Sequence, residues 1–456
     1  MLHWFRGFSI ALAGLALLTA PAAQPQTTAQ QPVPPSEHVI IFNNVRIFDG
    51  HGSGLSPVST VVVRGNRIER IRSGGSVDAV SDGAQIIDGD GRTLMPGLID
   101  VHTHMMYTII PQASILTGDV AYLNIAAGRA SEEMLMRGFT SVRDVGGPVF
   151  ALKRAIDSGV IDGPRIWPSG LSISQTGGHG DFRLPYELGS ADETHSHAEL
   201  LGAVADSPDA VRVAVRQQLA LGASQIKLMA GGGVASSYDP LDVTQYSPEE
   251  LRAAVDAAEN WGTYVTVHAY TPRAIRQAVI AGVRGIEHGQ LLDEATARLL
   301  AERHIWLTIQ AFFDDEDAVP FAPGSENRRK QLQLIAGTER AFQLVRQYNV
   351  PLAWGSDTLF SAQLATRQGA QLAKLSRWFT PAEVLAIATS HNADVLAMSG
   401  ARSPYAGRLG VVEEGALADL LLVDGDPTAD INLIADPERN FLVIMKDGRI
   451  YRNRIS

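Results

Sequence analysis

Two histidines follow an apolar segment with a single residue between them, in the sequence His102-Thr103-His104. In an extended strand, side chains two positions apart lie on the same face, so both imidazoles can bind one cation. Other polar side chains follow later apolar segments in the same way, namely His268, His288 and Asp357, and Lys227 lies within another apolar segment. Imidazoles and a carboxylate suit zinc or a similar divalent ion, so the pattern predicts a metal site.

The chain has no cysteine, which excludes thiolate ligands, disulfides and a cysteine nucleophile. Two metal ions about 3.5–4 Å apart would then need another bridging anion. Lys227 can supply one if carbon dioxide converts its amine to a carbamate, which would present one oxygen to each ion. That reaction needs the neutral amine, and burial near cations lowers the pKa of a lysine.

Eight apolar segments alternate with helical patterns between residues 94 and 400, and together they position these side chains. The pattern predicts an α/β fold, with a (β/α)8 TIM barrel over residues 95–400 and chemistry at the C-terminal ends of its strands. Two predicted helices open with capping boxes, at Ser247 and Thr380. No G-x-G-x-x-G follows the first strand, which argues against a dinucleotide fold. The predicted strands are Leu94–Val101, Thr140–Val145, Arg165–Ile173, Gln225–Met229, Tyr264–Val267, Val283–Glu287, Ile305–Ile309 and Pro351–Trp354.

Short β-rich segments flank the predicted barrel on both sides. They predict a small β-sandwich domain built from both chain termini, over residues 37–94 and 401–456. The expected N-terminal strands are Val39–Phe42, Val45–Phe48, Thr60–Arg64, Arg67–Ile71 and Gln85–Asp88, and the expected C-terminal strands are Leu420–Val423, Leu442–Lys446 and Arg449–Tyr451.

Residues 1–23 read as a secretory signal peptide. Arg6 supplies positive charge, an apolar run follows, and Ala20-Pro21-Ala22 has the small residues of a cleavage site. The alternative is an uncleaved membrane anchor, but the run is short for a bilayer. Residues 24–36 are polar and proline-rich, which predicts a disordered mature N-terminus. We therefore expect a periplasmic or secreted protein without a membrane segment in its mature form.

The composition is that of an ordinary globular protein. The 456 residues include 45% hydrophobic and 19% charged residues, and the net charge of −11 argues against a nucleic-acid partner. No Gly-x-Ser-x-Gly is present, so a serine hydrolase has no support.

Two longer motifs resemble a known family. Met95-Pro96-Gly97-Leu98-Ile99-Asp100-Val101-His102-Thr103-His104 is similar to the entry signature of the amidohydrolase superfamily, and the segment from Gly410 to Leu420 resembles its return into the β module. The resemblance covers roughly residues 39–451 and is strongest to the imidazolonepropionase-related branch, with its prolidase-like, carboxypeptidase-like and ochratoxinase-like amidases. It implies a barrel with a β-sandwich made from both termini.

The resemblance also implies roles for the candidate residues. His102, His104 and Asp357 match the more buried metal site, and His268 and His288 match the second. Lys227 matches the carboxylated lysine that bridges two Zn²⁺ or similar ions; the mononuclear members lack it. Asp357 would also carry the proton from a metal-bridging hydroxide to the leaving amine. Members of the family often form homo-oligomers.

Two further residues match positions that hold a substrate's free α-carboxylate in dipeptidase-like members. They are His179, in a glycine-rich turn after the third strand, and Tyr270, two residues beyond His268. Both side chains can donate hydrogen bonds to a carboxylate. The alternative is a purely structural turn with a solvated His179. For Arg143 we favour a structural role over substrate contact.

We therefore expect an exported zinc-dependent amidase that acts on a small molecule with a free carboxylate. It would cleave the amide bond to a C-terminal amino acid in dipeptides or N-acyl amino acids, with ochratoxin A among the candidates. The alternatives are a lactonase or cyclic-amide hydrolase on the same binuclear site, and a non-enzymatic binding protein.

Three other features carry weaker hypotheses. His195-Ser196-His197 repeats the H-x-H spacing, but it lies in a polar segment and is interpreted as solvated surface. The long stretch over residues 177–208 is a candidate lid. The acidic run Asp314-Asp315-Glu316-Asp317 is interpreted as a solvated loop rather than a calcium site.

Overall fold

The structure is a computed structural model that describes residues 38–52, 54–74, 83–188, 200–236 and 238–455. The predicted signal peptide, the predicted disordered segment 24–36 and the pair His195 and His197 lie outside the described residues. Among the residues described, no helix is both long and apolar enough to cross a membrane.

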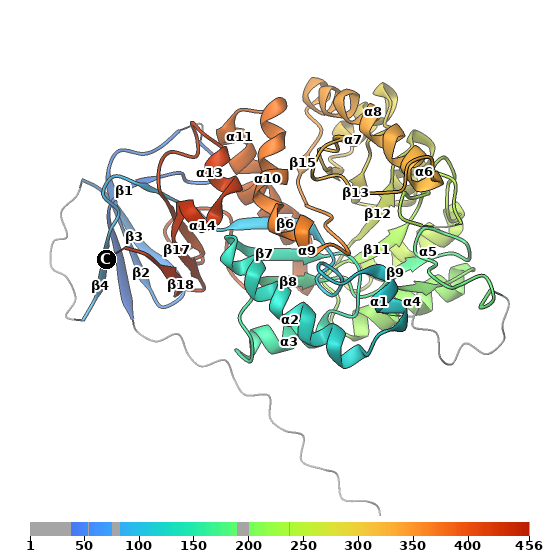
Figure 1. Cartoon of the computed structure of the whole chain (residues 1–456), viewed down its shortest axis with the longest axis horizontal. Coiled ribbons are helices and arrows are strands. Elements are labelled where there is room, and N and C mark those ends of the chain that lie inside the picture. Colours follow the sequence, from blue (N-terminus) through green and yellow to red (C-terminus); the bar gives the residue numbers. More distant parts are fainter. Residues whose placement is uncertain (1–37, 53, 75–82, 189–199, 237, 456) are drawn as a thin grey trace, which may run out of the picture. The chain divides into compact units, whose positions relative to one another are not determined.

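Strands from both ends of the chain share one eight-stranded mixed sheet (Figure 1). Its order is β18-β17-β16-β5-β1-β2-β3, and β4 pairs with β1. The prediction of one β module built from both ends of the chain is confirmed, and it takes the form of this sheet. The strands are β1 (Val39–Ile47), β2 (Ser59–Arg64), β3 (Arg67–Ser73), β4 (Gln85–Asp88), β5 (Thr93–Pro96), β16 (Leu420–Val423), β17 (Phe441–Lys446) and β18 (Arg449–Asn453).

Two of the predicted boundaries were wrong. Val39–Phe42 and Val45–Phe48 are not separate strands, because β1 runs through both with a register irregularity between Phe42 and Val45, where Asn44 has φ 53°. The predicted strand Leu94–Val101 is divided at Gly97 between two sheets. Gly97 N donates to Asp419 O over 2.8 Å, and a Cβ at Gly97 would collide with the Thr140 side chain. Only glycine fits this crossing point.

The middle of the chain forms two parallel sheets. One has seven strands in the order β10-β9-β11-β12-β13-β14-β15, and the other has the order β6-β7-β8. Each predicted barrel strand is present, although the third is divided into β8 and β9, and β10 was not predicted. The strands are β6 (Leu98–Thr103), β7 (Phe139–Asp144), β8 (Arg165–Pro168), β9 (Ser172–Ser174), β10 (Gly202–Val204), β11 (Ile226–Met229), β12 (Val265–Ala269), β13 (Gly285–His288), β14 (Trp306–Thr308) and β15 (Leu352–Ala353).

The strand ladders do not join these two sheets into a closed barrel. A few backbone hydrogen bonds connect them at the two seams. At the first seam Val101 N donates to Trp354 O at 3.3 Å and Asp357 N to His102 O at 2.9 Å, and at the second Ser224 N donates to Pro168 O at 2.7 Å. At the first seam the buried Asn392 amide donates to Ile99 O at 2.6 Å and to Trp354 O at 2.8 Å. One side chain thus ties the strand that bears His102 to the strand that precedes Asp357.

Helices surround the parallel strands, with α2 and α3 alongside β7 and β8 (Figure 1). Both predicted capping boxes are present, at Ser247 before α5 and at Thr380 before α11. The helices are α1 (Gln112–Thr117), α2 (Val120–Met136), α3 (Phe150–Asp157), α4 (Pro208–Ala220), α5 (Pro248–Glu259), α6 (Pro272–Ala281), α7 (Glu294–Glu302), α8 (Glu326–Tyr348), α9 (Ala362–Thr366), α10 (Gln368–Ala373), α11 (Pro381–Ala386), α12 (Asn392–Ala397), α13 (Asn432–Ala435) and α14 (Pro437–Asn440), with short 3-10 turns at Lys374–Arg377 and Gly400–Arg402 and a π-helical turn at Ile387–His391.

Candidate active site

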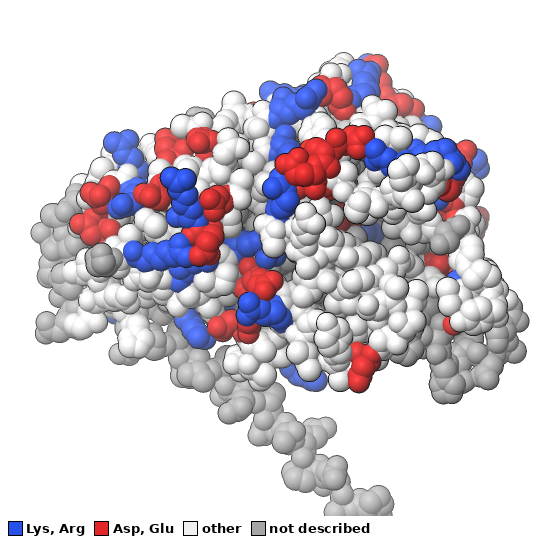
Figure 2. Space-filling view, viewed as in Figure 1, with Lys and Arg blue, Asp and Glu red and all other residues white. Residues whose placement is uncertain are grey.

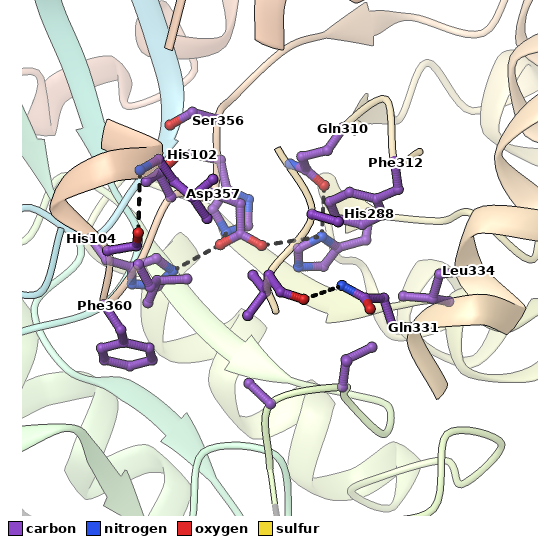
Figure 3. Close-up of a pocket in the computed structure, with 18 of the residues that line it drawn as sticks. His102, His104, His288, Gln310, Phe312, Gln331, Leu334, Ser356, Asp357 and Phe360 are labelled. Carbon is purple, nitrogen blue, oxygen red and sulfur yellow. Dashed lines mark hydrogen bonds and ion pairs between the residues drawn. The ribbon is translucent and has the colours of Figure 1, made fainter. Parts of the chain in front are cut away.

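Asp357 lies at the centre of the predicted metal ligands, between His104 and His288 (Figure 3). Its Oδ1 is 3.2 Å from His102 Nε2 and 3.5 Å from His104 Nε2, and its Oδ2 is 3.9 Å from His288 Nδ1. Candidate ligand atoms of His102, His288 and Asp357 all lie within 4.8 Å of one another. The structure therefore brings together side chains from β6, β13 and the segment after β15.

The two histidines of β6 are held in a way that suits metal binding. His102 Nδ1 is 2.8 Å from Glu287 Oε2, and His104 Nδ1 is 3.1 Å from Gly146 O. Each Nε2 is thereby directed toward Asp357. Metal-ligating histidines almost always bind a carboxylate or carbonyl through their other ring nitrogen, which fixes the tautomer. The donor set and its supporting contacts fit a divalent ion.

Backbone strain occurs at two residues of this group. Asp357 has φ 51° and His288 has φ 86°, in the left-handed region that residues other than glycine rarely adopt. A hydrogen bond of 2.9 Å from Asp357 N to His102 O holds the first of these in place. Such conformations persist only where the surroundings enforce them, and they cluster at functional sites.

Lys227 and His268 line the same cavity but lie outside the three-residue group. Lys227 is buried on β11, and this burial lowers the pKa of its amine to about 8. His268, on β12, has its ring centroid 4.5 Å from that of His288, and its Nε2 is 3.1 Å from Gly232 O. Burial therefore favours the neutral lysine that a carbamate would require.

A buried ion pair supports His102 from beneath. Glu287 accepts a hydrogen bond from Arg143 Nη2 over 2.7 Å, and both side chains are 1% exposed or less. Arg143 also donates to Val101 O over 2.6 Å and to the Tyr264 hydroxyl over 3.0 Å. The structural role favoured for Arg143 agrees with this position. Glu287 is a supporting residue that the sequence did not single out.

Glu287 and His288 have different functions although they are neighbours. Glu287 is paired in register with His268 and contacts Arg143, whereas His288 ends β13 with φ 86°, outside strand geometry, and lines the cavity. Burial raises the pKa of Glu287, but the Arg143 guanidinium and the contact with His102 outweigh it, and the net pKa is below the usual value. The carboxylate is therefore ionised.

The rings of His179 and Tyr270 both lie against the ring of His268. Their ring centroids are 4.1 Å and 4.7 Å from that of His268. His179 is only 14% exposed, which contradicts a solvated side chain, and its Nδ1 is 2.9 Å from Ser236 Oγ. Burial lowers the pKa of His179 to about 4, so the ring is neutral at neutral pH rather than an imidazolium.

The glycine-rich segment after β11 explains this close packing. A Cβ at Gly233 would collide with the imidazole of His179. Gly233 O also accepts a hydrogen bond of 3.1 Å from Lys330, a buried residue of α8. Position 233 must be glycine for the imidazole of His179 to lie this close to the backbone. The hydrogen bond from Lys330 attaches the same backbone to α8.

These side chains line a cavity of about 530 Å³, a size that encloses a small organic ligand. Part of its wall comes from the segment 309–325 between β14 and α8, which contains the acidic run. The expectation of a solvated loop is confirmed for Asp314, Asp315 and Glu316, which are exposed, but not for Asp317, whose side chain is 4% exposed. Each carboxylate of the run also has a cationic partner. The pairs are Asp314 with Arg328, Asp315 with Lys374, Glu316 with Arg367, and Asp317 with both Lys374 and Arg367.

Residues 93–451 match the Amidohydrolase family. The chain belongs to this family. Ochratoxinase from Aspergillus niger is 32% identical over 377 residues, which are 79% of this chain and 75% of that protein. A solved prolidase complexed with N-methylphosphonate-L-proline is similar with a TM-score of 0.83 and 35% identity, over 91% of this chain and 100% of that chain.

A third likeness is to a solved Xaa-Pro dipeptidase with methionine bound in its active site. It has a TM-score of 0.77 and 27% identity, over 91% of this chain and 100% of that chain. This amidohydrolase is thus a metal-dependent enzyme related to ochratoxinase and the prolidases, and it contains a His/His/Asp group for a metal.

Proposed function

We propose that this amidohydrolase cleaves the amide bond between an acyl or aminoacyl group and a C-terminal amino acid. The observation that carries the proposal is the position of His179 and Tyr270 in the cavity that contains the His/His/Asp group. They provide hydrogen-bond donors for a carboxylate beside the metal-binding residues. Dipeptides and N-acyl amino acids have this arrangement, and the likeness to ochratoxinase supports ochratoxin A as one candidate.

We propose two zinc ions as the cofactor. His102, His104 and Asp357 would hold one, His268 and His288 the other, and carboxylated Lys227 would bridge them. The ions would polarise the scissile carbonyl and make water a nucleophile at neutral pH. The proposal is supported by the presence of all six of these side chains in the lining of one cavity. The lowered pKa of Lys227 supports it as well.

Asp357 is the proposed proton carrier. Burial raises its pKa, but His102 and His104 beside it outweigh that effect and hold the pKa well below its usual range. The ionised carboxylate can accept the proton of the attacking water. It then delivers that proton to the leaving nitrogen, which must be protonated before the bond breaks.

Tyr270 and His179 are the proposed carboxylate anchors. Burial raises the pKa of Tyr270 well above 10, so its hydroxyl keeps the proton that it donates. His179 Nδ1 is 2.9 Å from Ser236 Oγ, so the other ring nitrogen, Nε2, is left to bind the carboxylate of the substrate. A neutral imidazole with its proton on Nε2 donates there while Nδ1 accepts from the serine.

The test is a panel of dipeptides, N-acyl amino acids, their methyl esters and lactones, given to the zinc-supplemented protein while released product is measured. We expect substrates with a free carboxylate to be turned over much faster than their methyl esters and the lactones. His179→Gln should raise KM for acids by roughly tenfold and leave esters unaffected. Turnover of esters or lactones at rates equal to the acids would favour the alternative, a lactonase or cyclic-amide hydrolase.

The remaining expectations are also proposals. We propose that the parallel sheets complete one (β/α)8 barrel over residues 95–400, supported by the seam bonds at Val101 and Ser224. Residues 37–94 and 401–456 would form the terminal β-sandwich. N-terminal sequencing of protein recovered from the periplasm or medium tests removal of residues 1–23.

We further propose a homo-oligomer. On the face shown in Figure 2, acidic and basic side chains are interspersed, and a broad uncharged area extends over the region of α1 and α2. Val120, Tyr122 and Ile125 of α2 are exposed apolar side chains. Light scattering on wild type and on Ile125→Asp tests this proposal.

A further inference from the structure

Tyr270 lies in an apolar part of the cavity wall. It packs with Leu334 in a small apolar cluster that also includes Val234 and Phe312. These four residues all line the cavity. Figure 3 shows Phe312 and Leu334 on the side of His288 and Gln310, across from His104 and Phe360. We call Val234, Phe312 and Leu334 the apolar wall.

The chemistry of the proposed substrate relates the apolar wall to the carboxylate anchor. In a C-terminal amino acid, one carbon bears both the carboxylate and the side chain. A carboxylate bound by Tyr270 therefore places that side chain within a few bonds of the anchor, where it meets the apolar wall. A charged side chain would lose its hydration against such a surface, whereas an aromatic or branched aliphatic one gains from burial.

Ion pairs hold the segment that carries Phe312. Lys374 Nζ is 2.7 Å from Asp315 Oδ2 and 2.6 Å from Asp317 Oδ2, and Arg367 pairs with Asp317 as well. We call these four residues the ionic clasp. The Asp317 side chain is 4% exposed and that of Lys374 is 16% exposed, whereas those of Asp315 and Arg367 are 30% and 34% exposed. The clasp is therefore buried at Asp317 and partly open to solvent elsewhere.

Further contacts fix the segment 309–325 on both sides of the clasp. The Phe313 ring stacks on Trp378 with centroids 5.8 Å apart. Gln331 of α8 donates to Val319 O over 2.9 Å (Figure 3). The residues that follow Phe312 are thus held by an aromatic stack and by an ion-pair cluster, and both restrict where Phe312 lies relative to Tyr270.

We infer that the apolar wall selects a large apolar side chain, aromatic or branched aliphatic, in the leaving amino acid, and that the ionic clasp is what positions Phe312 for this selection. The inference rests on the proposed function, because it takes Tyr270 as a carboxylate anchor. Phe312 is a specificity-determining residue, and Lys374 is a positioning residue that acts through it.

The experiment compares N-acetyl amino acids that differ only in the leaving residue: phenylalanine, leucine, alanine, glutamate and lysine. We expect kcat/KM for phenylalanine and leucine to exceed that for alanine by roughly tenfold or more, with glutamate and lysine poorest. Phe312→Ala should reduce the phenylalanine-to-alanine ratio by roughly tenfold. Free L-phenylalanine should inhibit the wild type more strongly than L-alanine, which tests the pocket without a variant.

The clasp is tested by substitution and rescue. Lys374→Met leaves two carboxylates facing one another, so we expect a higher KM for the phenylalanine substrate at similar kcat, and a smaller selectivity ratio. Lys374→Arg keeps the charge and should restore the ratio. The matched control is Arg129→Met, which removes an exposed ion pair on α2 and should change nothing.

The outcomes separate the two proposals. Release of all five leaving residues at equal rates, or a ratio unchanged by Phe312→Ala, would overturn the inference while the amidase function stands. An unchanged ratio in Lys374→Met, with a reduced one in Phe312→Ala, would overturn the clasp alone. No release from any carboxylate-bearing amide, with zinc bound, would overturn the proposed function and this inference with it.

Discussion

Replacing Arg143 by methionine should destabilise the protein strongly although the residue does not line the cavity. The substitution leaves Glu287, which is 0% exposed, without the guanidinium now 2.7 Å away. It also removes the hydrogen bonds to Val101 O and Tyr264 Oη, at 2.6 and 3.0 Å. Breaking a buried ion pair by removing one partner costs about 3–5 kcal/mol. We therefore expect the free energy of unfolding to fall by about 4 kcal/mol at pH 8.

Urea unfolding followed by circular dichroism measures this difference. With an m-value of about 3 kcal/mol/M or more for a chain of this length, the midpoint should fall by up to about 1.3 M. The exposed pair of Arg129 and Glu133 supplies the control, since Arg129→Met should leave the midpoint nearly unchanged. The double variant Arg143→Met/Glu287→Gln should cost less than the sum of the single variants, because neither charge is left unpaired.

The loss of stability in Arg143→Met should depend on pH. In the wild type the lowered pKa of Glu287 adds stability above its unfolded pKa, about 4.3, and this is lost only as pH falls through the folded pKa. In Arg143→Met burial dominates, so the pKa of Glu287 rises and folding takes up a proton. The deficit relative to wild type should therefore shrink between pH 8 and pH 5. An unchanged midpoint at pH 8, or a deficit independent of pH, would refute this account of the network.

Three further predictions concern the site and the seam beside it. Lys227→Ala should lower bound zinc, measured by mass spectrometry, and reduce turnover by roughly 10–100-fold or more; full zinc content with wild-type turnover would contradict a bridging lysine. A chelator should lower the melting temperature and added zinc should restore it, because ligands that bind only the folded state stabilise it; an unchanged temperature would argue against a bound ion. Asn392→Ala should cost about 2–4 kcal/mol in urea unfolding, since it removes the buried amide that donates to Ile99 O and Trp354 O and accepts from Trp354 N; a loss below about 1 kcal/mol would show that water replaces the amide.

The strands that position the site could be predicted because each is a short apolar run followed by a polar residue. His102, His268, His288 and Asp357 were identified by that rule, and Lys227 was identified as a lysine inside an apolar strand. The structure places all five around one cavity. Strand ends were less certain. A single residue such as Gly97 divides an apolar run between two sheets, and nothing in the hydrophobic pattern marks that division.

The supporting contacts could not be predicted, because they join residues that are far apart in the chain. Arg143 and Glu287 are separated by 144 residues, and only the strand order of the parallel sheets brings them together. The acidic run had the composition of a solvated loop, and its partners Lys374 and Arg367 lie on different turns of a later segment. The sequence shows which side chains can ionise or bind a metal. Their hydrogen-bond and ion-pair partners depend on how distant strands and helices are arranged in the fold.

The division of the chain at Gly97 has a consequence for synthesis. β5 leads directly into β6, the strand that carries His102 and His104, yet β5 pairs with β16, with Leu94 opposite Leu422. The ribosome makes β16 only after all strands of the parallel sheets have been made. β5, which leads into the histidine-bearing strand, therefore lacks its antiparallel neighbour until then. A product truncated before residue 420 would lose that neighbour, so a message cut short yields a chain in which β5 can pair only with β1.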